Sequence, residues 1–255
     1  MTQGKRALIV GVANDHSIAW GIAQALHRQG WQLAFTYQGE TLERRVRPLA
    51  ESVGSKLVMP LDVRNEGQMA EVYARLDEEW GGLDGLLHSV AFADRKDLEG
   101  RFVDTSREGF NMALEVSAYS LVSLTRGALP LFEKAKGGAV LCLSYYGAEK
   151  VVANYNVMGV AKAALEASTR YLANDLGPLN IRVNALSAGP VRTLAAAGIK
   201  GFKSMMKVAE EKSPLRRNVT LEEVGETGAF LLGAGAGGMS GSTVYVDSGY
   251  HILGM

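Results

Sequence analysis

The 255-residue chain carries 27 basic and 27 acidic side chains, so its formal net charge is zero at pH 7. This balance argues against a nucleic-acid partner, because proteins that bind nucleic acids carry a basic surplus. Hydrophobic residues make up 47% of the chain and charged residues 21%, which is typical of a globular protein with a sizeable core.

Metal and membrane sites are also disfavoured by the sequence. Cys142 is the single cysteine and cannot form an internal disulfide, and the four histidines are scattered without the spacing of metal ligands. We therefore expect no metal. No apolar run reaches the length of a membrane span, and the run at residues 7–10 is too short for a signal peptide. The sequence favours a cytoplasmic protein without a membrane partner.

Residues 6–30 predict a strand, a turn and a helix. The apolar strand breaks at Gly11, and the helical pattern follows Ser17 and stops at Gly30. Gly11 permits a tight turn through which the backbone can approach a phosphate, and Ser17 can cap the helix whose first amides would face it. The Gly-x-Gly-x-x-Gly string of dinucleotide-binding folds is absent, so a plain strand–turn–helix stays open.

Three further strands are expected at residues 31–37, 56–59 and 83–90. Gln38 ends the first and can hydrogen-bond the hydroxyls of an adenosine ribose; no basic residue follows at once, which favours NADH over NADPH. Asp62 follows the second, where its carboxylate suits the adenine amino group or caps the next helix. His88 lies inside the third among apolar residues and is interpreted as a core histidine.

The second half of the chain continues the alternation of helices and strands. A helix through residues 110–124 is apolar nearly all round, so we expect it to be buried on both sides, as at a subunit interface. Strands at 139–143 and 181–186 follow, and the small residues of loop 187–193 suit a nicotinamide amide and a phosphate. Apolar residues then repeat at helical spacing, which indicates either a flap over an apolar substrate, about residues 193–210, or ordinary core packing.

Strands that alternate with helices throughout predict one parallel sheet covered on both faces. This is a Rossmann-type doubly wound α/β fold in a single domain of residues 1–255. Ligands bind at the carboxyl ends of such strands, and the residues singled out above fall there.

Tyr155 and Lys162 lie seven positions apart on a helix expected to begin near residues 154–156. Two helical turns return them to one face, so the phenol and the ammonium can reach a common point, and Tyr145 can face the same space. A cation beside a phenol stabilises its ionised form and makes it a better proton donor. Taken alone, the pair is more simply a half-buried aromatic and a solvated lysine; the surrounding motifs favour catalysis.

Four parts of the sequence resemble the short-chain dehydrogenase/reductase superfamily and, within it, the bacterial enoyl-[acyl-carrier-protein] reductases. They are residues 11–21 (GVANDHSIAWG), 88–93 (HSVAFA) and 184–195 (NALSAGPVRTLA), together with Tyr145, Tyr155 and Lys162. The spacing Tyr-x6-Lys is the most specific part. Most of the superfamily has Tyr-x3-Lys and an earlier serine, whereas here Gly159 occupies the x3 position.

The resemblance implies that NADH reduces the trans-2 double bond of an enoyl thioester in fatty acid biosynthesis. It implies a catalytic set in which Tyr155 hydrogen-bonds the thioester carbonyl, Lys162 holds the nicotinamide ribose and Tyr145 lines the acyl pocket, with Ala93 beside the substrate. The residues implied to hold NADH or NAD+ are Gly11, Ser17, Ile18, Gln38, Asp62, Val63, Val90, Lys162, Val191, Thr193, Leu194 and Ala195.

The resemblance also implies partners. The family is usually tetrameric, and its substrate is carried by an acidic acyl carrier protein. Lys200, Lys203 and Lys207 lie beside the flap and Arg216 and Arg217 follow, so they can dock such a carrier; a solvated basic face is the simpler interpretation.

Two other functions stay open. One is a carbonyl (ketoacyl) reductase of the same superfamily, against which the missing x3 lysine and the missing serine argue. The other is a non-catalytic dinucleotide-sensing protein. Such a protein would need only the phosphate and ribose contacts, so the presence of both Tyr155 and Lys162 argues against it.

Overall fold

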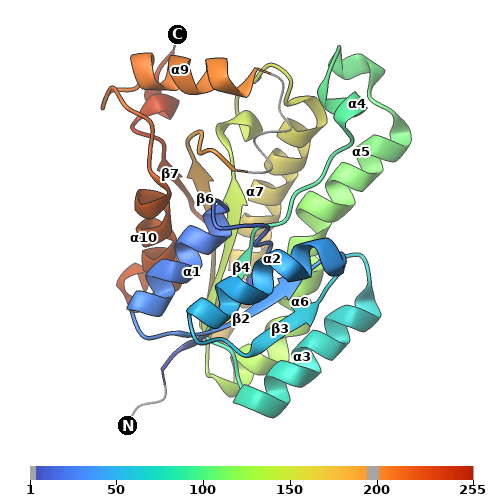
Figure 1. Ribbon diagram of the computed structural model, residues 1–255, viewed down its shortest axis with the longest axis vertical. Coiled ribbons are helices and arrows are strands. Elements are labelled where there is room, and N and C mark those ends of the chain that lie inside the picture. The colour runs from blue at the N-terminus through green and yellow to red at the C-terminus, as the bar shows by residue number, and fades with distance from the viewer. Residues whose placement is uncertain (1–3, 194–200, 255) are drawn as a thin grey trace.

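The computed structural model in Figure 1 describes residues 4–193 and 201–254. Within these ranges, seven parallel strands form one sheet in the order β3-β2-β1-β4-β5-β6-β7. The predicted doubly wound α/β fold is confirmed. The strands are β1 (Arg6–Val10), β2 (Gln32–Tyr37), β3 (Leu57–Pro60), β4 (Gly85–His88), β5 (Gly138–Ser144), β6 (Ile181–Ala188) and β7 (Thr243–Val246).

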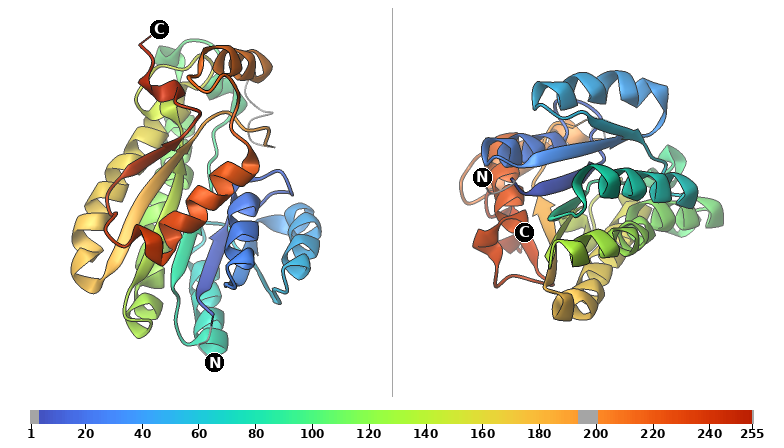
Figure 2. Two further views of the ribbon diagram at one scale, coloured as in Figure 1. Left: turned by 90° about the vertical axis from the view of Figure 1, so that its left-hand side faces the viewer. Right: turned by 90° about the horizontal axis from the view of Figure 1, so that it is seen from below.

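Two helical layers cover the sheet (Figure 2). Helices α1 (Ile18–Arg28), α2 (Gly39–Ser52) and α10 (Leu221–Leu232) pack on one face, and α3 (Glu66–Trp80), α6 (Ser120–Lys134) and α7 (Asn156–Leu176) pack on the other. Alternate residues of β1 serve opposite layers: Ala7 and Ile9 belong to the first core cluster, and Leu8 and Val10 belong to the second. A strand buried on both faces is apolar throughout, which is why it was readable from the sequence.

The strand order reverses at β1, whose two neighbours are β2 and β4. Val10 aligns with Thr36 on one side and with His88 on the other, so the carboxyl ends of these three strands lie together. Ligands of doubly wound sheets bind outside the carboxyl ends at such a reversal. The fold therefore places the loops after β1, β2 and β4 around one potential site.

The helix predicted at residues 110–124 is interrupted. Helix α5 (Arg107–Leu114) is followed by one π-helical turn, Glu115–Tyr119, before α6 begins. Within the single chain it is buried on one side only, so burial on both sides stays a prediction that depends on a subunit contact. A stripe of exposed side chains runs along it: Asn111, Glu115 and Tyr119 lie at four-residue spacing, and Arg126 follows seven residues later. The opposite stripe, with Leu121 and Leu124, is fully buried against the sheet.

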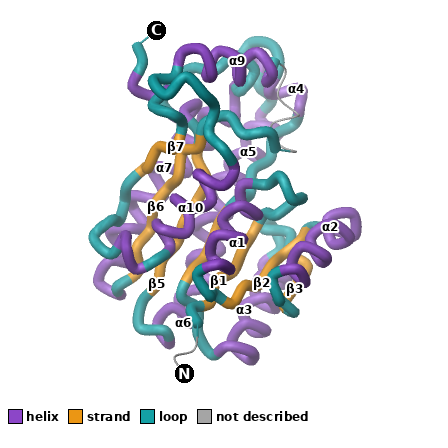
Figure 3. Tube along the Cα trace, turned by 60° about the vertical axis from the view of Figure 1, so that its left-hand side comes forward, coloured by secondary structure: helices purple, strands orange, loops and turns teal. Residues whose placement is uncertain are grey.

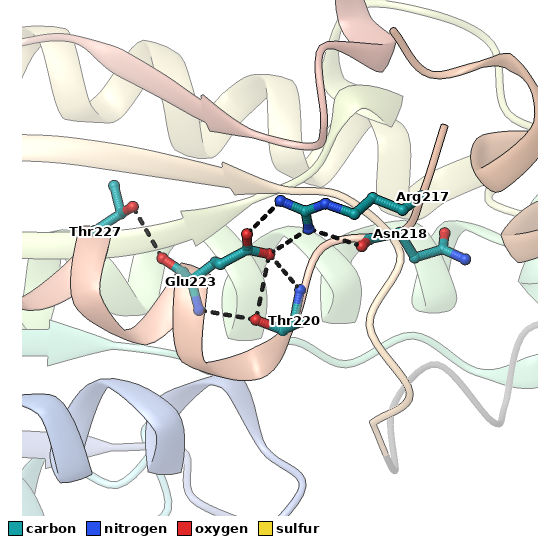
Figure 4. Close-up of polar contacts among 5 residues, drawn as sticks. All are labelled: Arg217, Asn218, Thr220, Glu223 and Thr227. Carbon is teal, nitrogen blue, oxygen red and sulfur yellow. Dashed lines mark hydrogen bonds and ion pairs between the residues drawn. The ribbon is translucent and has the colours of Figure 1, made fainter. Parts of the chain in front are cut away.

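Helix α10 begins with a capping box, which Figure 4 shows. The Thr220 hydroxyl accepts a hydrogen bond from the Glu223 amide at 3.1 Å, and the Glu223 carboxylate accepts one from the Thr220 amide at 2.9 Å. Arg217 donates to the same carboxylate at 2.6 and 2.8 Å and holds the pKa of Glu223 down at about 2. Arg217 is thus paired within the chain and is not a free basic residue.

Two short helices lie over the carboxyl ends of the strands. Figures 1 and 3 show α4 (Arg95–Leu98) and α9 (Phe202–Lys212) at the same end of the molecule. Helix α9 occupies the second part of the predicted flap; Leu194, Ala195, Ile199 and Lys200, in its first part, lie outside the described residues. In the described part of the chain, no helix is long and apolar enough to cross a membrane.

Candidate active site

A cavity of 860 Å³ opens at the carboxyl ends of the strands and runs from the loop after β1 to helix α9. Every described residue that the sequence assigned to cofactor, substrate or catalysis lines it. These residues are Gly11, Ser17, Ile18, Gln38, Asp62, Val63, Val90, Ala93, Tyr145, Tyr155, Lys162, Val191 and Thr193. Leu194 and Ala195 fall outside the described residues, so their assignment stays a prediction. The topology thus gathers residues from distant parts of the chain around one space.

Gly11 is required by the backbone of a neighbouring strand. Its φ is +108°, and a Cβ at this position would lie 2.1 Å from the carbonyl oxygen of Ser89. Any side chain would therefore collide with the loop after β4. The expected role, a close approach of the backbone to a phosphate, is compatible with this geometry, but the collision with Ser89 alone already demands glycine.

Ser17 precedes α1 but does not cap it through its side chain, so that prediction is wrong. Its hydroxyl oxygen instead accepts hydrogen bonds from the amides of Ala13 and Asn14, at 3.0 and 3.1 Å, and folds the turn back on itself. The Ser17 carbonyl accepts hydrogen bonds from the amides of Trp20 and Gly21. In the described part of the chain the amides of the first two residues of α1 have no partner, so they stay available to a negatively charged group.

The far end of the cavity is built by Gln38, Asp62 and Arg64. The Asp62 carboxylate accepts a hydrogen bond from Gln38 Nε2 at 3.0 Å and from Arg64 Nη2 at 2.9 Å, both on the same oxygen. Arg64 is the main reason that the pKa of Asp62 is lowered to about 2. Asp62 therefore stays ionised at neutral pH and can accept a hydrogen bond from an amino group. The alternative prediction is wrong, because Asn65, not Asp62, caps α3.

The aromatic end of the cavity is built by two tyrosines. Tyr155 stands directly before α7, and its ring meets that of Tyr145 edge to face, with the centroids 5.1 Å apart and an interplanar angle of 71°. Two glycines make room for this pair. A Cβ at Gly147 would lie 2.5 Å from the Tyr155 ring, and a Cβ at Gly159 would lie 2.7 Å from the Gly147 carbonyl oxygen. The turn Tyr146–Ala148 thus packs directly on α7 and against the Cδ1–Cε1 edge of the Tyr155 ring.

Lys162 is buried on α7, with 6% of its surface exposed, and lines the same cavity as Tyr155. Its ammonium donates a hydrogen bond of 2.6 Å to the carbonyl of Leu143, at the end of β5. Burial lowers the pKa of Lys162 to about 8, while Cys142 and Glu166 act in the opposite direction. The lysine is therefore mostly charged at neutral pH and is anchored to the strand that leads into Tyr145.

The expected electrostatic effect of Lys162 on Tyr155 is wrong. Burial raises the pKa of Tyr155, and the neighbouring Tyr145 adds to the increase. The phenol is 8% exposed, so desolvation of the tyrosinate outweighs any attraction to a cation nearby. Tyr155 is consequently a neutral hydrogen-bond donor over the physiological pH range. The pair still shares one cavity wall, as the helical spacing predicted.

His88 is a core residue, as predicted. It is 1% exposed, and its Nε2 lies 2.7 Å from the hydroxyl of Ser120. The hydroxyl of Ser120 donates to the carbonyl of Val116, so it accepts from Nε2–H. Burial, together with the positive charge of Lys162, lowers the pKa of His88 to about 3. The imidazole is therefore neutral and does not line the cavity.

A family model described as enoyl-(acyl carrier protein) reductase matches residues 11–251. The chain belongs to this family. An enoyl-[acyl-carrier-protein] reductase [NADH] FabI from Bacillus cereus is 52% identical to it over 256 residues, which cover 100% of this chain and 99% of that protein. A protein of the same description from Aquifex aeolicus is 51% identical over 255 residues, covering 100% of this chain and 94% of that protein.

Solved structures of enoyl-(acyl carrier protein) reductases share the fold. The enzyme from Anaplasma phagocytophilum in complex with NAD superposes with a TM-score of 0.95 at 52% identity, covering 99% of this chain and 96% of that one. The Bacillus cereus enzyme with NADP+ and indole naphthyridinone superposes with a TM-score of 0.96 at 52% identity, covering 99% and 98%. The family membership places this chain among oxidoreductases of the short-chain dehydrogenase/reductase superfamily.

Sequence reasoning missed several residues that line the cavity of this family member. Arg64 lies two positions past Asp62, so its place at the same strand end was a signal that could have found it. Met158 lies one turn beyond Tyr155 on the face that also carries Lys162, and the same periodicity could have found it. Met112 and Val116 had no such signal, because the π-helical turn that orients this segment has no simple sequence pattern.

Proposed function

We propose that this chain is an NADH-dependent enoyl-[acyl-carrier-protein] reductase, which reduces the trans-2 double bond of enoyl thioesters in type II fatty acid biosynthesis. The observation that carries the proposal is that Tyr145, Tyr155 and Lys162 line the same cavity as the start of α1, whose first backbone amides have no partner among the described residues. Full-length identity of 52% to a reductase described as using NADH supports both the reaction and the cofactor.

The cavity fits a dinucleotide along its length. Gly11 and the free amides at the start of α1 would receive the pyrophosphate, because backbone N–H groups and the helix dipole both favour anions there. Gln38 would contact the adenosine ribose, and Asp62 would accept from the adenine amino group. The remaining contacts are assigned to Ser17, Ile18, Val63, Val90, Lys162, Val191, Thr193, Leu194 and Ala195.

When bound, NADH supplies a hydride for the β-carbon of the enoyl thioester. Negative charge would then develop on the thioester carbonyl oxygen, and Tyr155 would donate a hydrogen bond to it. Such a donor accelerates the reaction because it binds the developing oxyanion more strongly than the neutral carbonyl. A neutral, buried phenol suits this role, since its pKa is raised and it keeps its proton. A proton taken up from water at the α-carbon would complete the saturated thioester.

Lys162 and Tyr145 have supporting roles. Lys162 would donate to the hydroxyls of the nicotinamide ribose from its anchor on Leu143 and would add positive charge beside the developing oxyanion. Tyr145 packs on Tyr155 and lines the acyl pocket together with Ala93 and other apolar residues. The apolar lining excludes water from the reacting carbons.

A carbonyl reductase is the second candidate, and the structure offers an argument against it. Such enzymes place a lysine four residues after the tyrosine, where this chain has Gly159. A Cβ there would lie 2.7 Å from the Gly147 carbonyl oxygen, so the position has no room for any side chain. A non-catalytic sensor is disfavoured by the buried, anchored Lys162, because burying an ammonium is costly without a function for it.

The deciding experiment supplies the purified protein with NADH or NADPH and with either a 2-enoyl or a 3-ketoacyl thioester, and follows absorbance at the wavelength of the reduced cofactor. Consumption of NADH with the enoyl thioester alone is expected. Consumption with the ketoacyl thioester would support the carbonyl reductase. Tight NADH binding without turnover of either substrate would support the sensor.

We also propose that an acidic acyl carrier protein docks beside α9. Lys203 and Lys207 lie on this helix, and Phe202 and Met205 of the same helix line the cavity, so a docked carrier would present its acyl chain at the mouth. Lys203→Glu should raise KM for a carrier-bound substrate several-fold and spare a small thioester, because charge reversal acts on the carrier alone. Equal effects on both substrates would remove the basis for docking here.

Other features belong to the proposal without a decisive observation. They are a homotetramer, a cytoplasmic location, a single domain of residues 1–255, and a flap formed by about residues 193–210. The exposed stripe of α5 and α6, which includes Tyr119, is a suitable subunit contact, because half-exposed aromatic side chains are enriched at interfaces. Sedimentation of the purified protein measures its oligomeric state directly.

A further inference from the structure

The last two residues of β5 are held against α7, and the residue after β5 packs on the residue that precedes α7. The Leu143 carbonyl accepts from Lys162, the Ser144 hydroxyl donates to the carboxylate of Glu166, and the Tyr145 ring packs on Tyr155. Lys162 and Glu166 are four residues apart, so they lie about 6 Å along the same face of α7. The strand end that carries Tyr145 therefore has two polar anchors on one helix.

Glu166 is an unusual residue for this place. It is 7% exposed, its one hydrogen-bonding side-chain neighbour in the described structure is the Ser144 hydroxyl, and it does not line the cavity. A carboxylate this deeply buried is costly unless it is compensated. Leucine or alanine would continue the apolar face of α7 without that cost, so a polar residue here calls for a function.

We propose that Glu166 is a positioning residue for the reaction: it holds Ser144, and with it the end of β5, and it places a carboxylate one turn beneath the Lys162 ammonium. The inference rests on the proposed reductase function. Glu166 touches neither substrate nor cofactor, and it acts through the backbone that receives Lys162 and through the charge that faces it.

Several titratable groups surround this pair. Lys162 is faced by Cys142 of β5, by His88 of β4 and by Glu166 itself. Burial raises the pKa of Glu166, and Glu149 after β5 adds to the increase, whereas the hydrogen bond from Ser144 and the charges of Arg170 and Lys162 on α7 act in the opposite direction. The hydroxyl of Tyr245 in β7 donates a hydrogen bond to the carboxylate of Glu149.

The two parts of the proposal are separable by substitution. Glu166→Gln keeps an oxygen that accepts from Ser144 but removes the charge. Ser144→Ala keeps the charge but removes the anchor. Glu166→Asp keeps the charge and draws the carboxylate back from Ser144. Glu149→Gln is the matched control, because Glu149 is a carboxylate beside the same pair that faces Tyr245 and Glu166 but not Lys162.

The first readout is the pH dependence of the dissociation constant for NADH, followed by cofactor fluorescence without substrate. Binding by the wild type should weaken as pH rises past the range where Lys162 loses its proton, and this decline is the alkaline limb of the pH profile. Glu166→Gln should move that limb to lower pH by about half a unit, since a nearby negative charge favours the ammonium. Ser144→Ala, Glu166→Asp and Glu149→Gln should leave the limb in place.

The second readout is kcat with an enoyl thioester at saturating NADH. Ser144→Ala and Glu166→Asp should each lower kcat by about tenfold, because the strand end that carries Tyr145 is loosened. Glu149→Gln should retain it. A merely structural role for Glu166 would lower the melting temperature without moving the limb, and that result would overturn the proposal.

If Glu166→Gln does not fold, Ser144→Ala and Glu166→Asp still decide. Wild-type kcat in either of them would overturn the anchoring role. A failure of the proposed reductase activity can be told apart from a failure of this proposal. If the wild type binds NADH but reduces no enoyl thioester, the pH dependence of NADH binding can still be measured, and its shift in Glu166→Gln still tests the effect of the Glu166 charge.

Discussion

Replacing Gly147 with alanine would insert a methyl group against the ring of Tyr155. The new Cβ would lie 2.5 Å from Cδ1 and 2.8 Å from Cε1 of that ring. Carbon atoms in contact are about 3.5–4.0 Å apart, so the ring or the turn must move by roughly 1 Å. Neither moves freely, because the ring packs on Tyr145 and a Cβ on Gly159 would lie only 2.7 Å from the Gly147 carbonyl oxygen.

The consequence for rate should exceed the consequence for stability. Overpacking of this kind costs about 1–3 kcal/mol, which lowers Tm by several degrees in a chain of this size. A misplacement of about 1 Å in a catalytic group can reduce the rate by about 100-fold. For Gly147→Ala we therefore expect kcat to fall by about 10- to 100-fold. The dissociation constant for NADH should stay within about twofold of the wild-type value.

The assay combines turnover of an enoyl thioester at saturating NADH, cofactor fluorescence and thermal unfolding. Gly177→Ala is the matched control: Gly177 follows α7, its φ is −51°, and a Cβ there would meet nothing within 4 Å. The control should keep wild-type kcat. If Gly147→Ala lowered Tm but kept kcat, the position of the Tyr155 ring would not limit the reaction, and the assignment of this residue would fail.

Three further substitutions test the other parts of the site. Tyr155→Phe should leave NADH affinity nearly intact and lower kcat by about 100-fold, as for the loss of one oxyanion donor; normal turnover would reassign the donor. The wild-type free energy of unfolding should rise between pH 8 and 10, because Lys162 keeps its proton there in the unfolded chain but has lost it in the folded one, where its pKa is about 8. Lys162→Met should abolish this rise; an unchanged dependence of the free energy of unfolding on pH, measured by denaturant titration, would contradict this. Arg64→Ala should weaken NADH binding by roughly fivefold at unchanged kcat, because Arg64 orients Asp62 far from the chemistry; a fall in kcat would count against it.

The fold was predictable because β1, β4 and β5 are buried on both faces. Such strands are apolar without alternation, and the helices between them show the 3.6-residue period. The site followed from the topology, since every parallel strand ends at the same edge of the sheet. The sequence therefore predicts that residues far apart in the chain, such as Gln38 and Asp62, lie together, and their side chains meet at 3.0 Å.

The sequence did not predict which hydrogen-bond partners the polar side chains have. Ser17 stands directly before α1, where a hydroxyl usually caps the helix, yet its oxygen accepts hydrogen bonds from the amides of the preceding turn. The choice depends on the path of residues 13–14, which no local propensity encodes. The π-helical turn Glu115–Tyr119 was missed for a related reason: one inserted residue shifts the face of a helix without changing its composition.

Burial also reversed an argument made from charge alone. Proximity of a lysine suggested an easily ionised Tyr155, but the ring is 8% exposed, and desolvation raises the pKa of its phenol. The direction of such a shift depends on how much water the fold removes. Spacing along a helix carries information about which side chains share a face but not about how dry that face is.

The opposite pKa shifts of Tyr155 and Lys162 decide which group limits the reaction in alkaline solution. The pKa of Tyr155 is raised, whereas that of Lys162 is lowered to about 8. A reaction that needs the ammonium is fully active below this value and declines as pH rises through it, long before the phenol ionises. The alkaline limb of kcat/KM for NADH should therefore lie near pH 8 in the wild type and in Tyr155→Phe alike, because that ratio reports groups of the free enzyme. Loss of the limb in Tyr155→Phe would mean that the phenol titrates there, and the neutral-donor mechanism would have to be abandoned.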